Sequence, residues 1–238
     1  MLTEEQIELN YARFKKYIEG YIKVENIQYF LYWLDTTNCK VAPATTKYNG
    51  SYRGGFVEHC LNVFTRMFKL LQFDYGDDIP YDKQTIAVVS LLHDLDKIDK
   101  YEIQMKNKKD ENGNWIQEPF YSVKDTFNRL VYGNPPQNTI YIIEQFFPLT
   151  YEEKLAIMYQ SGGIYEGTTD GIYAAMNTFK VCPLAYYLYQ ADFYYVCEVG
   201  SKYKEYDTKA YTNIFDNVCD EVKDMFVKPE EEQKEEAK

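Results

Sequence analysis

A run of apolar residues ends in an imidazole beside a carboxylate. Residues 87–92 are apolar except for Ser90, and His93 and Asp94 follow directly. An ionised carboxylate at the end of such a run is costly unless a counter-charge pairs with it. Because neutral imidazole and carboxylate are both good ligands for divalent metals, a bound cation is the natural counter-charge. His93 and Asp94 are therefore the first candidate ligands.

The chain has only two histidines, and the second, His59, also lies on an apolar stripe. In the helix predicted over residues 56–73, the i+3 and i+4 steps place His59 on one face with Phe56, Val63 and Met67. A lone histidine there would be a core residue hydrogen-bonded to a carbonyl. The presence of the His93-Asp94 pair in the same chain favours a metal ligand instead.

A third candidate position is Asp192, on the helix predicted over residues 183–199. The apolar face of this helix carries Asp192 together with Leu184, Leu188, Ala191 and Tyr195. A solvated aspartate does not normally lie on such a face. Asp192 is therefore expected either to pair with a buried arginine or histidine, or to bind a metal.

Lys97 follows His93 by four residues in the central helix predicted over residues 84–97. At that spacing the two side chains share a helix face, so Lys97 could lie near a metal and offer charge to a phosphate. The alternative is a solvated lysine that pairs with Asp94 or Asp96. The spacing alone leaves both interpretations open.

The rest of the pattern predicts a helical protein with one inserted β-hairpin. Alternating residues on either side of the turn signal at 110–114 indicate a surface hairpin over about 101–123, near one edge of the site. Thr3 and Thr150 open capping boxes. Further helices are predicted over residues 3–19, 25–34, 139–147, 150–160, 170–179 and 211–226, with loops over 35–55 and 130–138.

Composition limits the class of protein. The net charge of −11 makes a broad nucleic-acid footprint unexpected, because such footprints are usually basic. Five cysteines without a C-x-x-C pair favour a reducing compartment. With no signal-peptide pattern or membrane-length apolar run, we expect a cytoplasmic protein: one domain over residues 1–228 and a disordered acidic tail over 229–238.

Together, His59, the His93-Asp94 pair and Asp192 resemble the ligands of the HD superfamily of metal-dependent phosphohydrolases. The resemblance extends to ordered segments across about residues 40–200. They are Ala42-Pro43-Ala44, Gly54 to Val63, Leu92 to Ile98, Gly162-Gly163 and Leu188 to Asp192. The hairpin insert also resembles one in HD proteins of tailed bacteriophages, which implies a phage-encoded protein in the host cytoplasm.

The resemblance implies an all-α HD-domain bundle that holds one divalent ion (Mn, Mg, Fe, Ni, Co or Zn). The implied metal ligands are His59, His93, Asp94 and Asp192, and the implied catalytic residues are Asp94 and Lys97. Hydrolysis by a metal-activated water would cleave a phosphate ester or anhydride of a nucleotide or related small molecule. The implied substrate-binding residues are Lys97, Arg53, Arg66, Gln160 and Asn134.

The chain also departs from the family pattern. HD proteins with two metals carry further histidines at positions where this sequence has Asn49, Asn134 and Gln160. We therefore expect a single ion. Two alternatives remain open: a 3′–5′ nuclease of HD type, suggested by residues 54–63, and a degenerate HD module that binds a nucleotide or a partner without hydrolysis.

Overall fold

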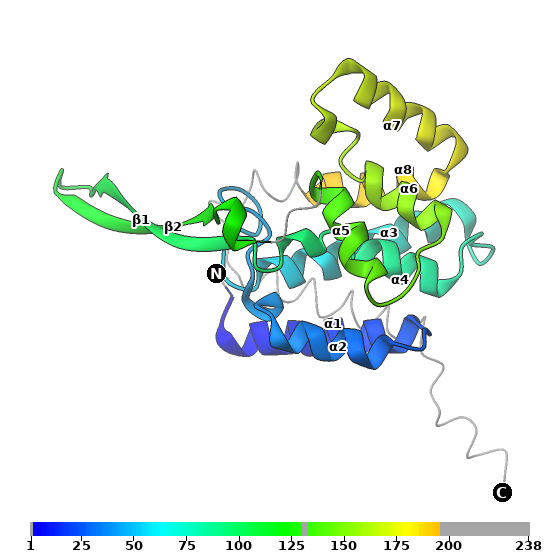
Figure 1. Ribbon diagram of the computed structural model, residues 1–238, viewed down its shortest axis with the longest axis horizontal. Helices are drawn as coiled ribbons and strands as arrows, with labels where there is room; N and C mark the ends of the chain where they lie inside the picture. The colour runs from blue at the N-terminus through cyan, green and yellow to red at the C-terminus, as the bar shows by residue number, and fades with distance from the viewer. Residues whose placement is uncertain (1, 130–132, 196–238) are drawn as a thin grey trace, which may run out of the picture. The chain divides into compact units, whose positions relative to one another are not determined.

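Helices form most of the described part of the chain, which is residues 2–129 and 133–195 of the computed structural model (Figure 1). This confirms the expectation of a helical fold with an inserted hairpin. The α-helices are α1 Glu4–Tyr21, α2 Ile27–Thr36, α3 Gly55–Tyr75, α4 Lys83–Leu91, α5 Pro135–Glu144, α6 Tyr151–Tyr159, α7 Thr169–Val181 and α8 Pro183–Tyr194. None of the described helices is long and apolar enough to span a membrane.

Helix α3 lies at the centre of the helical body. It packs against α1, α4 and α8, while α6 packs against α8 (Figure 1). Phe56 and Phe64 of α3 are fully buried, as are Phe14 of α1 and Phe30 of α2. Residues 56, 60, 63, 64, 67 and 71 make one side of α3 apolar. Because that side is enclosed by neighbouring helices, a polar residue within it must meet other protein groups.

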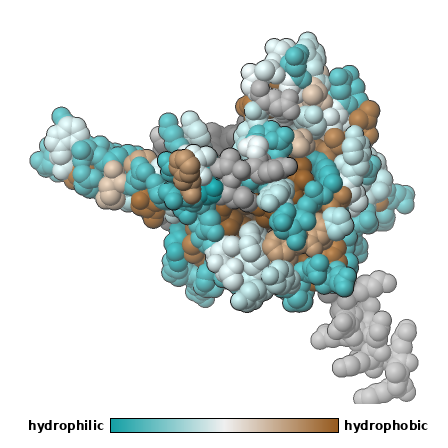
Figure 2. Space-filling model, in the orientation of Figure 1, coloured by the Kyte–Doolittle hydropathy of each residue, from teal (hydrophilic) through white to brown (hydrophobic). Residues whose placement is uncertain are grey.

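The predicted hairpin is confirmed. Strands β1 (Tyr101–Lys109) and β2 (Trp115–Val123) pair antiparallel, from Tyr101 opposite Val123 to Lys109 opposite Trp115. The Asp110 carboxylate accepts hydrogen bonds from the Asn112 and Asn114 amides and so closes the turn. The hairpin extends away from the helices, and hydrophilic side chains cover much of it (Figures 1 and 2).

Both predicted capping boxes are present. The Thr3 hydroxyl accepts from the Gln6 amide, and the Gln6 side chain accepts from the Thr3 amide. Thr150 and Glu153 exchange the same pair of bonds at the start of α6. Each pair satisfies two amide groups that the first turn of a helix would leave without partners.

The prediction of a central helix reaching residue 97 is wrong. Helix α4 ends at Leu91, and a short 3₁₀ helix, η2 (Leu95–Lys97), follows. His93 and Asp94 therefore lie in the turn between the two, and the argument that His93 and Lys97 share a helix face does not hold. The Lys97 amide donates to the Asp94 carbonyl rather than to the His93 carbonyl, at 3.0 Å.

Other boundaries shift by a few residues. Helix α5 starts at Pro135, four residues before its predicted start, because Asn134 caps it and proline suits the first helical position. Helix α8 is described to Tyr194. Residues 196–199 of its predicted range, the helix predicted over 211–226 and the acidic tail over 229–238 lie outside the described residues. A single domain over residues 1–228 stays a prediction.

The start of α3 packs closely against the preceding loop, where Gly55 lies next to Gly50. A Cβ on Gly55 would collide with the Gly50 carbonyl oxygen, whereas Gly20 in α1 has open space around it. We expect Gly55→Ala to lower the free energy of unfolding by about 1–3 kcal/mol or more. Gly20→Ala should raise it by about 0.5–1 kcal/mol, because alanine is the better helix former.

Urea unfolding of both glycine variants measures these changes. Similar free energies for the two variants would contradict the packing described at the start of α3.

Candidate metal centre

His59 lies in the second turn of α3, and the start of that helix is tied to the preceding loop. The Gly54 amide donates to the Val41 carbonyl at 3.2 Å, and the Phe56 amide donates to the Ala42 carbonyl at 3.0 Å. Only 12% of the His59 side chain is exposed. These bonds hold the start of α3 against the loop and so fix the backbone position of His59.

His93 is fully buried in the turn after α4. Its Nδ1 lies 2.8 Å from the Ser90 carbonyl oxygen, which can only accept, so Nδ1 carries the proton. The Nε2 atom of the neutral ring is then unprotonated, and its lone pair can bind a metal. Burial lowers the pKa of His93, which favours this neutral form. Such a hydrogen bond to the second ring nitrogen is typical of metal-binding histidines.

The imidazoles of His59 and His93 meet two carboxylates. The two Nε2 atoms are 3.1 Å apart. Oδ1 of Asp192, on α8, is 3.2 Å from His59 Nε2 and 3.9 Å from His93 Nε2. Oδ2 of Asp94 is 3.6 and 3.8 Å from the same two nitrogens. The chain thus brings together all four residues that the sequence suggested as ligands.

The spacing of these atoms fits a single ion. Ligand atoms about 2.1 Å from a metal, at tetrahedral or octahedral angles, lie about 3.0–3.4 Å from one another. The donor atoms of His59, His93 and Asp192 all lie within 4.8 Å of one another, close enough to hold one ion. Two nitrogen and two oxygen donors suit a borderline transition metal such as Zn, Fe, Co, Ni or Mn.

The charges of the cluster shift the pKa values of His59 and Asp94 in opposite directions, and only the shift of Asp94 favours the form that binds a metal. Burial alone would lower the pKa of His59, but the hydrogen bond to Asp192 and the charges of Asp192 and Asp94 outweigh it, so the pKa is raised. Burial alone would raise the pKa of Asp94, but the charges of Lys97, His93 and His59 outweigh it and lower the pKa. Asp94 is therefore ionised at neutral pH, as a ligand must be.

Lys97 lies beside the cluster. Its Nζ is 3.8 Å from Asp94 Oδ1 and 3.8 Å from Asp96 Oδ1, and only 10% of the side chain is exposed. Burial alone would lower the pKa of Lys97, but the charges of Asp94 and Asp96 raise it well above its usual range. Asp96 also pairs with Lys100. Lys97 therefore places a fixed positive charge next to the candidate ligands.

Two of the predicted substrate-binding residues have structural contacts. Asn134 caps α5, with its Oδ1 accepting from the Gln137 amide at 3.0 Å. Gln160 is almost fully buried, and its Nε2 lies 3.1 Å from the His93 carbonyl oxygen and 3.2 Å from Asp94 Oδ1. The Asn49 side chain, the third departure from the family pattern, donates to the Tyr195 carbonyl next to the end of α8.

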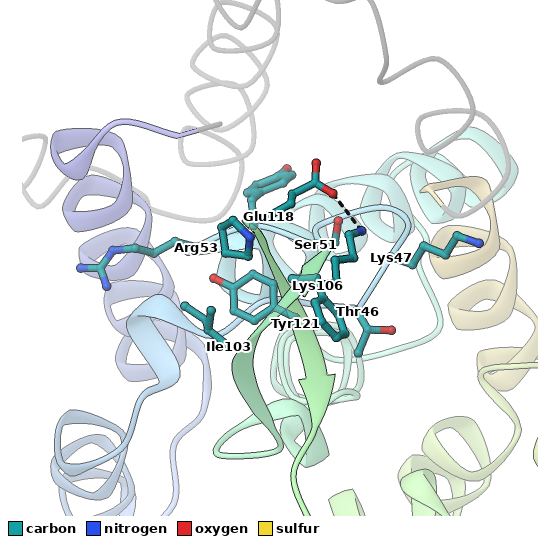
Figure 3. A pocket seen from close by; sticks show the side chains of 11 residues that line it. Thr46, Lys47, Ser51, Arg53, Ile103, Lys106, Glu118 and Tyr121 are labelled. Atoms are coloured by element: carbon teal, nitrogen blue, oxygen red, sulfur yellow. Dashed lines mark ion pairs between the residues drawn. The ribbon is translucent and has the colours of Figure 1, made fainter. Parts of the chain in front are cut away.

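Neither predicted arginine forms an ion pair with the four ligands in the described structure. The Arg66 guanidinium lies over the ring of Tyr194, 4.3 Å from its centroid. Arg53 extends toward α1, where Nε and Nη2 donate to the Glu4 carboxylate at 3.0 Å each (Figure 3). The roles of both arginines in substrate binding stay predictions.

Arg53 also lines a cleft of about 400 Å³ between the hairpin and the loop before α3 (Figure 3). One wall comes from that loop, and the other comes from the hairpin, where Lys106 pairs with Glu118 at 3.0 Å. The residues lining the cleft do not include the four candidate ligands. The cleft and the metal centre are therefore built from different residues.

Two contacts next to the candidate ligands were not predicted from the sequence. Ser90 orients His93, and its position three residues earlier was the available signal. Buried Glu58, next to His59, accepts a hydrogen bond from the Tyr52 hydroxyl, and no sequence pattern indicated that contact.

Comparison with protein-family models, curated proteins and solved structures gives no match for this chain. The resemblance to HD proteins, including those of phages, therefore stays a prediction, and the function is argued from the site itself.

The donor cluster predicts that metal binding stabilises the fold. We expect excess Mn²⁺ or Zn²⁺ to raise the melting temperature of EDTA-treated protein, because a ligand that binds only the folded state shifts the unfolding equilibrium. Asp192→Asn should remove most of this shift. Asp82→Asn is the control, since asparagine also caps helices and residue 82 lies at the other end of α4.

Differential scanning fluorimetry measures these shifts. Equal metal-induced shifts in Asp192→Asn and the wild type would contradict the assignment of Asp192 as a ligand.

Buried Glu58 should make the stability of the fold depend on pH. Burial raises its pKa to about 7, so folding favours the protonated carboxyl and the wild type loses stability as the pH rises from about 4.5 to 7. Glu58→Gln cannot ionise and should avoid this loss. We expect it to be more stable than the wild type at pH 8, by up to about 3 kcal/mol, with a much smaller difference at pH 4.5.

Urea unfolding in EDTA at the two pH values measures this difference. If Glu58→Gln changes the free energy of unfolding by the same amount at both pH values, the raised pKa of Glu58 is contradicted.

Proposed function

We propose that this chain is a metal-dependent phosphohydrolase of HD type that acts on a nucleotide or a related small phosphate ester. The observation that supports the proposal is the convergence of His59, His93, Asp94 and Asp192 beside the buried ammonium of Lys97. Two imidazoles and two carboxylates can hold an octahedral divalent ion with part of its coordination sphere open to other ligands. The adjacent lysine offers charge to a phosphate group.

Each residue has a role that its contacts make reasonable. A divalent ion bound here would supply Lewis acidity and lower the pKa of a bound water. His93 presents its Nε2 lone pair because Ser90 holds Nδ1–H. Asp94 turns Oδ2 toward the imidazoles and Oδ1 toward Lys97. Lys97 keeps its proton and stabilises negative charge on the transferring phosphoryl group.

Single-metal chemistry is proposed because the residues at the positions of the further histidines make other contacts. The Asn134 side chain caps a helix, and Gln160 faces Asp94 with its amide NH₂ group, which donates hydrogen bonds and does not bind a metal. A small substrate is proposed over a nucleic acid because the chain carries a net charge of −11, which disfavours a long phosphate backbone.

Phosphate release from a panel of ribo- and deoxynucleotides, with Mn²⁺, Mg²⁺, Co²⁺ or Ni²⁺, tests the proposal. We expect turnover of at least one nucleotide. Lys97→Met should lower kcat by about 100-fold, the usual cost of losing one group that stabilises transition-state charge. Lys106→Met is the control, because Lys106 pairs with Glu118 on the hairpin, and this variant should keep wild-type activity.

Other outcomes decide between the alternatives. Metal and nucleotide binding without product would favour a non-hydrolytic binding module. Loss of a labelled oligonucleotide under the same conditions would favour a nuclease. Absence of turnover on every substrate, in protein shown to contain metal, would contradict the phosphohydrolase proposal.

A further inference from the structure

Gln160 connects α6 to the turn that carries two of the candidate ligands. It directly follows α6, and only 1% of the residue is exposed. Its amide nitrogen spans the backbone and the side chain of the turn, with the His93 carbonyl oxygen at 3.1 Å and Asp94 Oδ1 at 3.2 Å. One buried side chain thus contacts both residues of the His-Asp pair.

The orientation of the amide is set by these two contacts. A carbonyl and an ionised carboxylate can only accept hydrogen bonds, so Gln160 must present its NH₂ group to them. A flipped amide would place Oε1 against two other oxygens. Oε1 has no hydrogen-bond partner among the described residues, so the orientation is not explained by a contact on the other side.

The two carboxylate oxygens of Asp94 therefore face different partners. Oδ1 faces the Gln160 amide and, at 3.8 Å, the Lys97 ammonium. Oδ2 faces the Nε2 atoms of His59 and His93 at 3.6 and 3.8 Å. Rotation of the carboxylate would cost the hydrogen bond to Gln160, so this bond keeps Oδ2 directed toward the imidazoles.

We infer that Gln160 is a positioning residue, which directs Oδ2 of Asp94 onto the metal and thereby sets metal affinity. The inference rests on the proposed metal centre and assigns Gln160 a role other than contact with substrate. Outer hydrogen bonds of this kind typically change metal affinity by about 10- to 100-fold.

The competing interpretation is that Gln160 only stabilises the fold by holding α6 against the turn. Thr139 provides a matched control for that interpretation. Thr139 is fully buried in α5, and its hydroxyl accepts a hydrogen bond at 3.2 Å from the amide of Asp96, in η2 directly after the turn. Thr139→Val removes a buried hydrogen bond to η2 without changing the contacts of Asp94.

The experiment measures Mn²⁺ affinity by isothermal titration calorimetry, and the melting temperature of metal-free protein, for the wild type, Gln160→Met and Thr139→Val. We expect both variants to lower the melting temperature. Only Gln160→Met should weaken Mn²⁺ binding, by about 10- to 100-fold. Thr139→Val should stay within about 3-fold of the wild type, because Thr139 does not contact a ligand.

A second variant covers the case in which Gln160→Met does not fold. Gln160→Asn keeps a polar amide but is one methylene shorter, so it cannot hold both contacts and should also weaken Mn²⁺ binding. Wild-type affinity in either folded Gln160 variant, or an equal loss in Thr139→Val, would overturn the positioning role. Absence of Mn²⁺ binding to the wild type would overturn the metal centre itself, and neither result depends on hydrolysis.

Discussion

Neutralisation of buried charge is the constraint on which the rest of this structure depends. The carboxylates of Asp94 and Asp192 face two imidazoles that are themselves 3.1 Å apart. Lys97 balances part of this charge but contacts Asp94 and Asp96 rather than Asp192. Because unpaired buried charge is costly, a divalent cation between the four donors would remove the cost and join three separate elements.

Local patterns were sufficient to predict many of the elements. The capping boxes at Thr3 and Thr150, the turn of the hairpin and the apolar face of α3 all depend on residues within a few positions of one another. The same periodicity placed His59 and Asp192 on buried faces. Their convergence, however, was expected from a family resemblance, because single-helix patterns do not say which faces meet.

The end of α4 could not be read from local sequence. The run around His93 contains no glycine or proline that would stop a helix, so the pattern continued to Lys97. Bonds from distant residues end it instead: the Gln160 amide donates to the His93 carbonyl, and the Thr139 hydroxyl accepts from the Asp96 amide. These partners come from α5 and the end of α6. Tertiary hydrogen bonds therefore replace the helical ones here, and the resulting turn places His93 and Asp94 beside His59 and Asp192.

A crystal structure of the metal-loaded protein, with anomalous diffraction recorded at the metal absorption edge, tests the central claim most directly. The account predicts one anomalous peak per chain at this centre, within about 2.0–2.2 Å of both Nε2 atoms and of an oxygen from each aspartate, Asp94 and Asp192. A peak bound by other residues, or imidazoles of His59 and His93 that remain hydrogen-bonded with no ion between them, would contradict it.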